Sequence, residues 1–276
     1  MTNTNVHIFQ NKAWYFLSIY YSRDKWPELL SQITQFYDLR QEQFSDCLVF
    51  LSEERGDHIQ VALGSLDRTW NHQNEIANFF QSYINTNPSF STKIFPYGKT
   101  LWCNYSNNTL IWDRFRIENY TDWYTRFHQQ TFRLAGQLLG NDFSFDNILS
   151  CALYLAFKGL VCFDPDMKND VLSYTLNEVS DRFENYNSFE SLLQSLIDEI
   201  DDWEICETVE TYRREDISDY SSELIEWLIE VKSMKEAGFR YFCLMIGNIL
   251  GLSGLHFILV LKLLDIWQKA FLITNN

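Results

Sequence analysis

The sequence predicts an α+β protein, in which an N-terminal antiparallel sheet with packed helices precedes a mostly helical second half. Two observations lead to this prediction: strand-like segments are confined to the first part of the chain, and later apolar segments repeat at helical spacing. A chain of 276 residues can bury a full core. Because no Pro-, Gly- or Ser-rich linker and no internal repeat is present, we expect a single domain over 1–276, with a sheet-containing part (1–120) and a mainly helical part (121–276).

The first elements are predicted as strand, helix, strand and strand. The β-branched and aromatic segment 13–21 (AWYFLSIYY) favours a strand. In 26–39 (WPELLSQITQFYDL) apolar residues recur at helical spacing, and Pro27 lies in the first turn, where its missing N–H costs nothing. The segments 44–54 and 58–66 predict two strands joined by an Arg-Gly-Asp turn, which is a hairpin.

Helices dominate the remaining prediction. The segment 69–88 is typical of a helix that ends at Asn-Pro, and 99–115 of two short strands around a Ser-Asn-Asn turn. Helical periodicity then appears in the segments 120–140, 146–163, 188–212 and 221–238 and in the final apolar segment.

The apolar run 241–261 is almost long enough to span a membrane. However, Asn248, Ser253, His256 and three glycines interrupt the run, and no second such segment occurs. An ionisable side chain inside a bilayer is costly. We therefore expect a buried helix, or two helices broken near the Gly-Leu-Ser-Gly sequence, and no membrane association.

Composition limits the partners. The formal net charge is −15, from 37 acidic and 22 basic residues, which argues against nucleic acid and against anionic membranes. A basic peptide would be attracted to such a surface, although acidity more often only maintains solubility. No charged start followed by an apolar stretch marks a secretory signal, so we expect a cytoplasmic protein.

Motifs for cofactors and metals are absent from the sequence. None of GxGxxG, GxxxxGK[ST], HExxH, GxSxG or an EF-hand loop occurs, and the six cysteines form no CxxC pair. We therefore expect no cofactor and no metal. Polar residues at the ends of elements remain as candidates, above all His58 with Arg55 and His256 with Ser253, because histidine transfers protons near neutral pH. The alternatives are a solvated turn residue for His58 and a hydrogen-bonded core residue for His256.

Four segments, AWYFLSIYY, VFLSEERGDHIQVAL, NNTLIWDRFRIENY and SGLHFILVL, occur in an order that resembles one known family. It is the C-terminal elimination domain of lantibiotic dehydratases, also found as stand-alone thiopeptide-type bacteriocin biosynthesis proteins. Its members carry a strand with Trp and Tyr, then Pro-His-Leu-Arg-Leu-Arg, then Tyr-x-Pro-Glu-x-Glu-Arg-Tyr-Gly-Gly, and finally Ser-x-x-His-x-x-x-Asn-Arg. The resemblance in order covers most of the chain.

The match at the second segment is partial. His58 stands where the family has its histidine, but Gln60 and Ala62 replace the two arginines that follow. In the family, arginines and a histidine handle a glutamyl leaving group, because cations bind a carboxylate and a positioned base removes the α-proton. This sequence has lost those arginines.

The resemblance also assigns later residues. Glu118 and Tyr120 match the Glu-Arg-Tyr segment, and His256 matches the late histidine, with Ser253 three residues before it. The predicted site residues are His256 and His58 for proton transfer, with Arg55, Gln60, Arg114, Arg116, Glu118, Tyr120 and Ser253 lining or orienting the substrate site.

Three interpretations follow from the resemblance. The chain is an enzyme that modifies a ribosomally made precursor peptide, as an elimination-like or cycloaddition-type lyase. Alternatively, it is a catalytically degenerate relative that binds a precursor or leader peptide or a dehydratase partner. In the third interpretation the likeness is confined to the fold. A homodimer is left open in each case.

Overall fold

The computed structural model describes residues 6–9, 11–68, 71–90, 105–112, 128, 132–133, 136–137, 139–182, 194–195, 197–198, 207, 211, 222–252 and 254–274. The chain divides into two compact units, residues 1–144 and 145–276. The described residues form five strands and seven α-helices, which confirms the predicted α+β class. The expectation of one domain stays a prediction.

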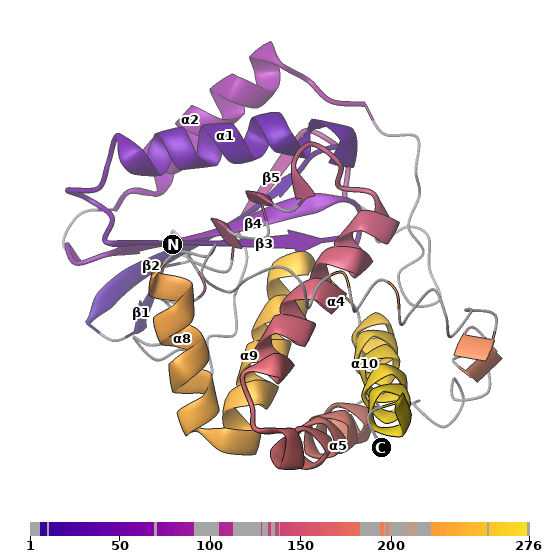
Figure 1. The fold of residues 1–276 in the computed structure, drawn as a ribbon. Coiled ribbons are helices and arrows are strands. Elements are labelled where there is room, and N and C mark those ends of the chain that lie inside the picture. The colour runs from indigo at the N-terminus through magenta and orange to yellow at the C-terminus, as the bar shows by residue number, and fades with distance from the viewer. Residues whose placement is uncertain are drawn as a thin grey trace. The chain divides into compact units, whose positions relative to one another are not determined.

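The N-terminal unit is built on one antiparallel sheet (Figure 1). Its strands are β1 (Val6–Phe9), β2 (Lys12–Tyr20), β3 (Asp46–Ser52), β4 (His58–Ser65) and β5 (Thr109–Trp112). The order is β1-β2-β4-β3, and β5 also pairs with β2. Since β4 pairs with one side of β2, the strands β1 and β5 follow one another along its other side. The predicted hairpin is confirmed as β3 and β4, whereas β1 was not predicted.

Both faces of β4 are buried. The alternation predicted for Ile59, Val61 and Leu63 is present, and these side chains are at most 2% exposed. The opposite face is buried as well, because Ala62 belongs to an apolar cluster on the sheet. The other buried members of this cluster are Trp14, Phe16, Leu48 and Phe50.

Two α-helices pack on the sheet of this unit and lie on the same face (Figure 1). They are α1 (Trp26–Asp38), preceded by the 3-10 turn η1 (Arg23–Lys25), and α2 (Gln73–Thr86). Both were predicted, and Pro27 lies in the first turn of α1 as expected. The two helices meet at Phe36 and Phe80, whose ring centroids are 5.3 Å apart. Apolar spacing in the sequence therefore located both helices correctly.

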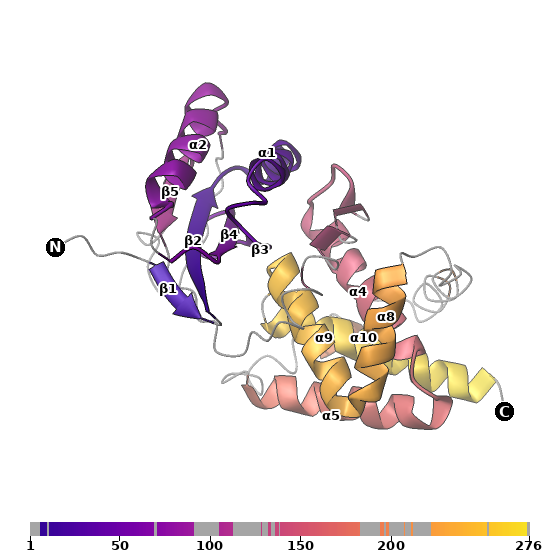
Figure 2. The same ribbon diagram turned by 90° about the vertical axis from the view of Figure 1, so that its left-hand side faces the viewer.

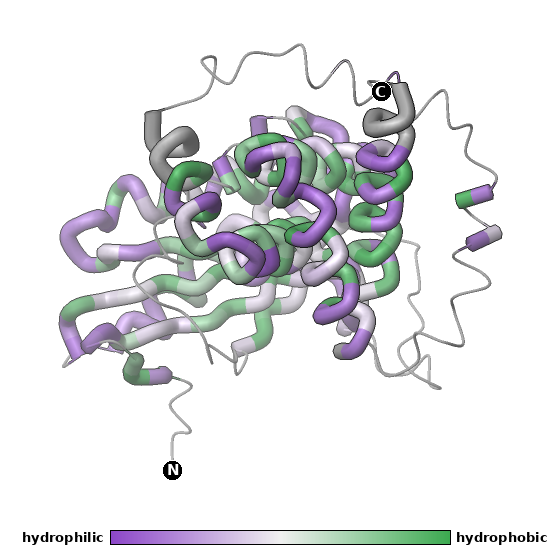
Figure 3. Tube along the Cα trace, turned by 60° about the horizontal axis from the view of Figure 1, so that its bottom comes forward, coloured by the Kyte–Doolittle hydropathy of each residue, from purple (hydrophilic) through white to green (hydrophobic). Residues whose placement is uncertain are grey.

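The C-terminal unit is helical. Its helices are α4 (Phe145–Val161), α5 (Pro165–Arg182), α8 (Ser222–Ser233), α9 (Lys235–Leu250) and α10 (Gly254–Thr274). Figure 2 shows the five helices gathered into one bundle, and Figure 3 shows hydrophobic stretches interrupted by hydrophilic residues along the helices. The sequence prediction omitted α5. The segment 221–238 is divided at Lys235, whose φ of 52° interrupts the helical backbone.

The apolar run 241–261 contains parts of two helices, α9 and α10. This confirms the alternative in which the run is broken near the Gly-Leu-Ser-Gly sequence. Gly251 ends α9 in the left-handed conformation, with φ at 67°. The N–H of Leu252 donates to the carbonyl of Gly247 at 2.9 Å, which gives this helix end the hydrogen bonding of a Schellman motif. In the part of the chain that the structure describes, no helix is both long and apolar enough to cross a membrane.

Candidate functional site

The described residues contain part of the predicted site. Arg55, His58 and Gln60 lie together at the start of β4 in the N-terminal unit, and His256 lies in α10 of the C-terminal unit. The other predicted site residues, Arg114, Arg116, Glu118, Tyr120 and Ser253, lie outside the described residues.

His58 is a buried histidine, not the solvated turn residue considered as an alternative. Its side chain belongs to the first residue of β4 and only 2% of the residue is exposed. Nδ1 lies 2.9 Å from the carbonyl oxygen of Gly56. Because a carbonyl only accepts hydrogen bonds, Nδ1 carries the proton, and the lone pair of the neutral ring is therefore on Nε2. This arrangement gives His58 a defined basic nitrogen.

The neighbouring strand fixes the plane of this imidazole. Tyr20 is the strand partner of His58 across the β2–β4 pairing. The two rings stack with centroids 4.5 Å apart and an interplanar angle of 27°. Stacking on a buried tyrosine limits rotation of the histidine ring, so the direction in which Nε2 points is determined by the sheet.

The turn before β4 is held by an ion-pair network. Asp57 is buried, and its carboxylate accepts a hydrogen bond of 3.1 Å from the guanidinium of Arg23. Arg23 also pairs with Glu53. Gly56, with φ at 121°, adopts a backbone conformation that side chains disfavour. The carbonyl that orients His58 is therefore part of a rigid turn.

Arg55 extends the site from the same turn. Its backbone carbonyl accepts a hydrogen bond of 2.9 Å from the N–H of Tyr105, and its guanidinium donates to the Tyr105 hydroxyl at 3.4 Å. The ring of Tyr105 lies 4.9 Å from that of Tyr20. Arg55, Tyr105, Tyr20 and His58 thus form a continuous series of contacts, which we call the aromatic–cation stack. Sequence reasoning missed both tyrosines, because only the pairing of distant segments brings them there.

Gln60 lies two residues after His58 in β4, so the two side chains are on the same face of the sheet. It is partly buried and pairs across the sheet with Ser18 on one side and Phe50 on the other. These side chains border an enclosed void of about 10 Å³, which is about the room that one water needs. Gln60 therefore contributes a neutral amide to this face, where the family has a cation.

His256 lies in the first turn of α10, near its start at Gly254. Its ring contacts that of Phe145 in an edge arrangement, with centroids 4.5 Å apart and an angle of 62°. The residue is partly buried, and the choice between a hydrogen-bonded core residue and a chemical role stays open. Its assignment to proton transfer stays a prediction.

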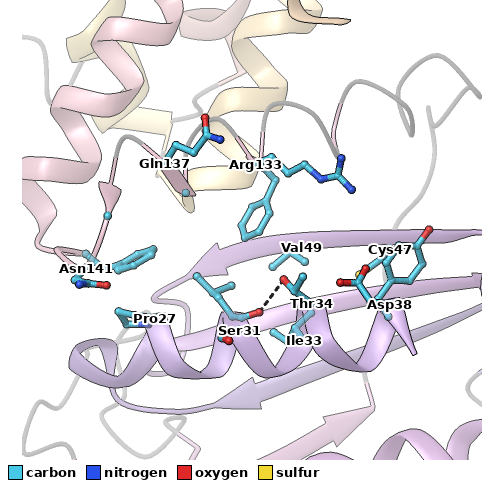
Figure 4. A pocket seen from close by; sticks show the side chains of 16 residues that line it. Pro27, Ser31, Ile33, Thr34, Asp38, Cys47, Val49, Arg133, Gln137 and Asn141 are labelled. Carbon is cyan, nitrogen blue, oxygen red and sulfur yellow. Dashed lines mark hydrogen bonds between the residues drawn. The ribbon is translucent and has the colours of Figure 1, made fainter. Parts of the chain in front are cut away.

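A larger hollow lies elsewhere in the N-terminal unit. It has a volume of about 450 Å³ and runs between α1 and the described residues 132–133, 136–137 and 140–143, with Cys47 and Val49 of β3 among its walls (Figure 4). No sequence motif indicated this hollow, because two of its walls come from segments about a hundred residues apart. Figure 4 shows the side chains of Ser31, Thr34, Arg133 and Gln137 around it.

The thiols of Cys47, Cys151 and Cys162 are buried or partly buried. Burial raises the pKa of Cys47 and of Cys151 to about 12, and that of Cys162 to about 11. A thiolate is the reactive form of cysteine, so these side chains are inert near neutral pH. Within the described ranges, no cluster of three or more His, Cys, Asp or Glu side chains could hold a metal ion.

Comparison with known proteins identifies relatives by structure only. No family model matches the chain, and no curated protein matches its sequence. The solved structure of "Pyridine synthase, TbtD, from thiomuracin biosynthesis" superimposes with a TM-score of 0.63, covering 94% of this chain and 99% of that one at 13% identity. The chain shares its fold. The structure of TsrL matches with a TM-score of 0.52 at 10% identity, over 94% of this chain and 96% of that one. At these identities the likeness establishes the fold alone.

Proposed function

We propose that this chain acts on a ribosomally made precursor peptide in thiopeptide-type biosynthesis, as a cycloaddition-type or elimination-like lyase. The observation that carries the proposal is the extent of the fold match, 94% of this chain and 99% of a chain named as a pyridine synthase from thiomuracin biosynthesis. The order of sequence segments points independently to the same family. Proteins that share a fold over their whole length need not share a reaction, so the chemistry must be argued from the residues.

His58 supplies the proton-transfer group in this proposal. Its Nδ1–H is held by the Gly56 carbonyl and its ring by Tyr20, and the family resemblance is the basis for assigning proton transfer to this residue. Arg55, in the same turn, provides a cation for a carbonyl or carboxylate of the substrate. His256 is proposed as the second proton-transfer residue, on the basis of the family resemblance.

The residues of β4 favour a cycloaddition-type reaction over glutamate elimination. Elimination in the family uses a carboxylate clamp of arginines, and here the two positions are the amide of Gln60 and the buried methyl group of Ala62. A cycloaddition requires a shaped pocket and a few hydrogen-bond donors rather than a clamp. The same observation supports a second candidate function, in which the chain binds a precursor peptide or a dehydratase partner without turnover.

The test uses the purified protein and the dehydrated form of a precursor peptide encoded beside its gene, with products followed by mass spectrometry. We expect a new product mass with the wild type, and its loss in His256→Ala and His58→Gln with unchanged circular dichroism. His7→Gln, a histidine substitution on β1, is the control and should retain product formation. Product formation that persists in both site variants would refute the catalytic assignment.

The binding function predicts a different outcome from the same proteins. No product would form with the wild type, and His256→Ala would change the affinity for the precursor peptide by less than about twofold, because one side chain of a broad interface is usually near-neutral. Titration calorimetry of both proteins with that peptide separates the two functions. Association with a dehydratase, or of two copies of the chain, remains a prediction.

A further inference from the structure

Two neighbouring hollows of the N-terminal unit lie along α1. The first is the 450 Å³ hollow between α1 and the described residues 132–133, 136–137 and 140–143. The second has a volume of about 660 Å³ and lies toward the start of α1. Pro27, Ser31 and Asn141 line both of them, so the two hollows adjoin at these residues. We call the two adjoining hollows the α1 groove.

The two parts of the α1 groove differ in chemistry. The part over β3 has an apolar floor, to which Val49 and Phe143 contribute, each only 5% exposed. Its exposed lining also includes Asp38 and Arg133, one charge of each sign.

The part near the helix start is bordered by the exposed carboxylates of Asp24 and Glu28. Lys25 reaches Glu28 at 3.3 Å on the solvent side and neutralises part of this charge. A ligand that fills the whole groove therefore needs an apolar group at one end and a positive charge at the other.

The length of the α1 groove suits an extended chain. The helix has 13 residues, which corresponds to about 20 Å, and about six residues of extended peptide span that distance. A single compact small molecule would occupy one of the two hollows and leave the other open. A short linear segment fits both, with its backbone passing Ser31.

The wall opposite α1 contains glycines that internal packing does not require. Gly136 is in a helical segment, and a Cβ built on it would meet no atom of the described residues within 4 Å. Gly140 has open space as well, but its φ of 56° is a left-handed backbone conformation that itself favours glycine. Glycine inside a helix is unfavourable relative to alanine. A helical glycine that packing does not require therefore indicates a functional reason for the missing side chain. Here the glycine widens the groove and allows a bound backbone to approach closely.

We propose that the α1 groove binds an extended peptide segment, with an apolar side chain over Val49 and a basic side chain beside Asp24 and Glu28. The proposal deepens the proposed function by naming the chemistry of the bound segment, and it rests on that function only for the source of the peptide. Binding in the groove does not require turnover, so the groove proposal and the proposed function can be refuted independently.

The test measures fluorescence anisotropy of a fluorescein-labelled hexapeptide, Lys-Ser-Leu-Phe-Ser-Ser, its reversed sequence, and a version of each with Glu in place of Lys. We expect saturable binding of at least one Lys peptide below about 1 mM. Ser31→Trp places an indole in the middle of the groove and should weaken that binding at least tenfold. Gln35→Trp is the matched control, because Gln35 is exposed on α1 outside the groove, and it should leave binding unchanged.

Charge-removing variants and the salt dependence of binding test whether the lysine of the peptide lies beside Asp24 and Glu28. The double variant Asp24→Asn, Glu28→Gln should weaken the Lys peptide about fivefold at low salt, because exposed charge pairs are individually weak. The difference should disappear in 0.5 M NaCl, because salt screens exposed charges. Absence of binding by the wild type, equal binding of Lys and Glu peptides, or unchanged affinity in Ser31→Trp would each overturn the proposal. If these peptides do not bind the groove but the precursor peptide is still converted, the groove proposal is refuted and the proposed function is not.

Discussion

His128 contacts the outer side of β3, and replacing it tests how that side is stabilised. Among the strands that the structure describes, β3 is the last in the sheet order, so one side of its backbone has no partner among them. Nε2 of His128 lies 3.1 Å from the amide nitrogen and 2.9 Å from the carbonyl oxygen of Val49. Its ring contacts Phe50 with centroids 4.5 Å apart. In a given tautomer Nε2 either accepts from the N–H or donates to the carbonyl, so the fully buried side chain makes one hydrogen bond to the outer side of β3 at Val49.

This contact makes the stability of the fold depend on pH in a defined window. Burial lowers the pKa of His128 from its ordinary value of 6.5 to about 3, so the unfolded chain binds the proton more tightly than the folded one. The contribution of the neutral ring is complete above pH 6.5 and decreases as the pH falls toward 3. One proton corresponds to about 1.4 kcal/mol per pH unit, so about 2–3 kcal/mol is lost between pH 6.5 and 4.5.

Two variants distinguish the effect of His128 protonation on stability from the effect of its hydrogen bonding to Val49. His128→Gln does not titrate in this range, and its amide can both donate to and accept from Val49, so it should lose about 2–3 kcal/mol less than the wild type between pH 6.5 and 4.5. His128→Phe keeps the ring against Phe50 but leaves a buried peptide group unpaired, which should cost about 1–3 kcal/mol at every pH. Urea unfolding curves at a series of pH values measure both effects. Parallel stability profiles for the wild type and His128→Gln would refute the reasoning.

Three further substitutions test packing and charge. Gly159→Ala would place a Cβ 2.2 Å from the ring of Phe242, so we expect a loss of about 1–3 kcal/mol in thermal unfolding, partly reversed by Phe242→Leu. Arg23→Met leaves the buried carboxylate of Asp57 without its ion pair and should cost about 3 kcal/mol in urea unfolding at neutral pH, with a smaller loss if Asp57→Asn is added. Gly251→Ala forces a side chain into the left-handed conformation at φ 67°, and calorimetry should show a loss of about 1–2 kcal/mol.

Local patterns predicted most of the elements, and long-range pairing explains most of what they missed. The strands β2, β3 and β4 and the helices α1 and α2 follow from alternation, helical spacing and turn residues within each segment. By contrast, β1 has only four residues, and α5 is polar along much of its length, so neither has a strong apolar repeat. The sequence of a segment cannot report a strand partner that lies elsewhere in the chain.

In the candidate site, too, local features could be predicted from the sequence and long-range contacts could not. The turn and the strand start at His58 were visible in the sequence, and so was the histidine itself. Its orientation depends on Tyr20, which the β2–β4 register places opposite it, and on Tyr105, which a backbone hydrogen bond to Arg55 brings near. These contacts join segments that are dozens of residues apart, and no periodicity within one segment encodes them.

The burial of β4 also limits which chemistry can be assigned to it. Ala62 is 1% exposed and packs with Trp14, Leu48 and Phe50, so a guanidinium at this position would lose its hydration without gaining a partner among these side chains. The family's second arginine therefore cannot be restored here by a single substitution without disrupting an apolar cluster. Because alanine fills this position of the packed sheet, the proposed function assigns the chemistry to His58 and Arg55 and needs no carboxylate clamp.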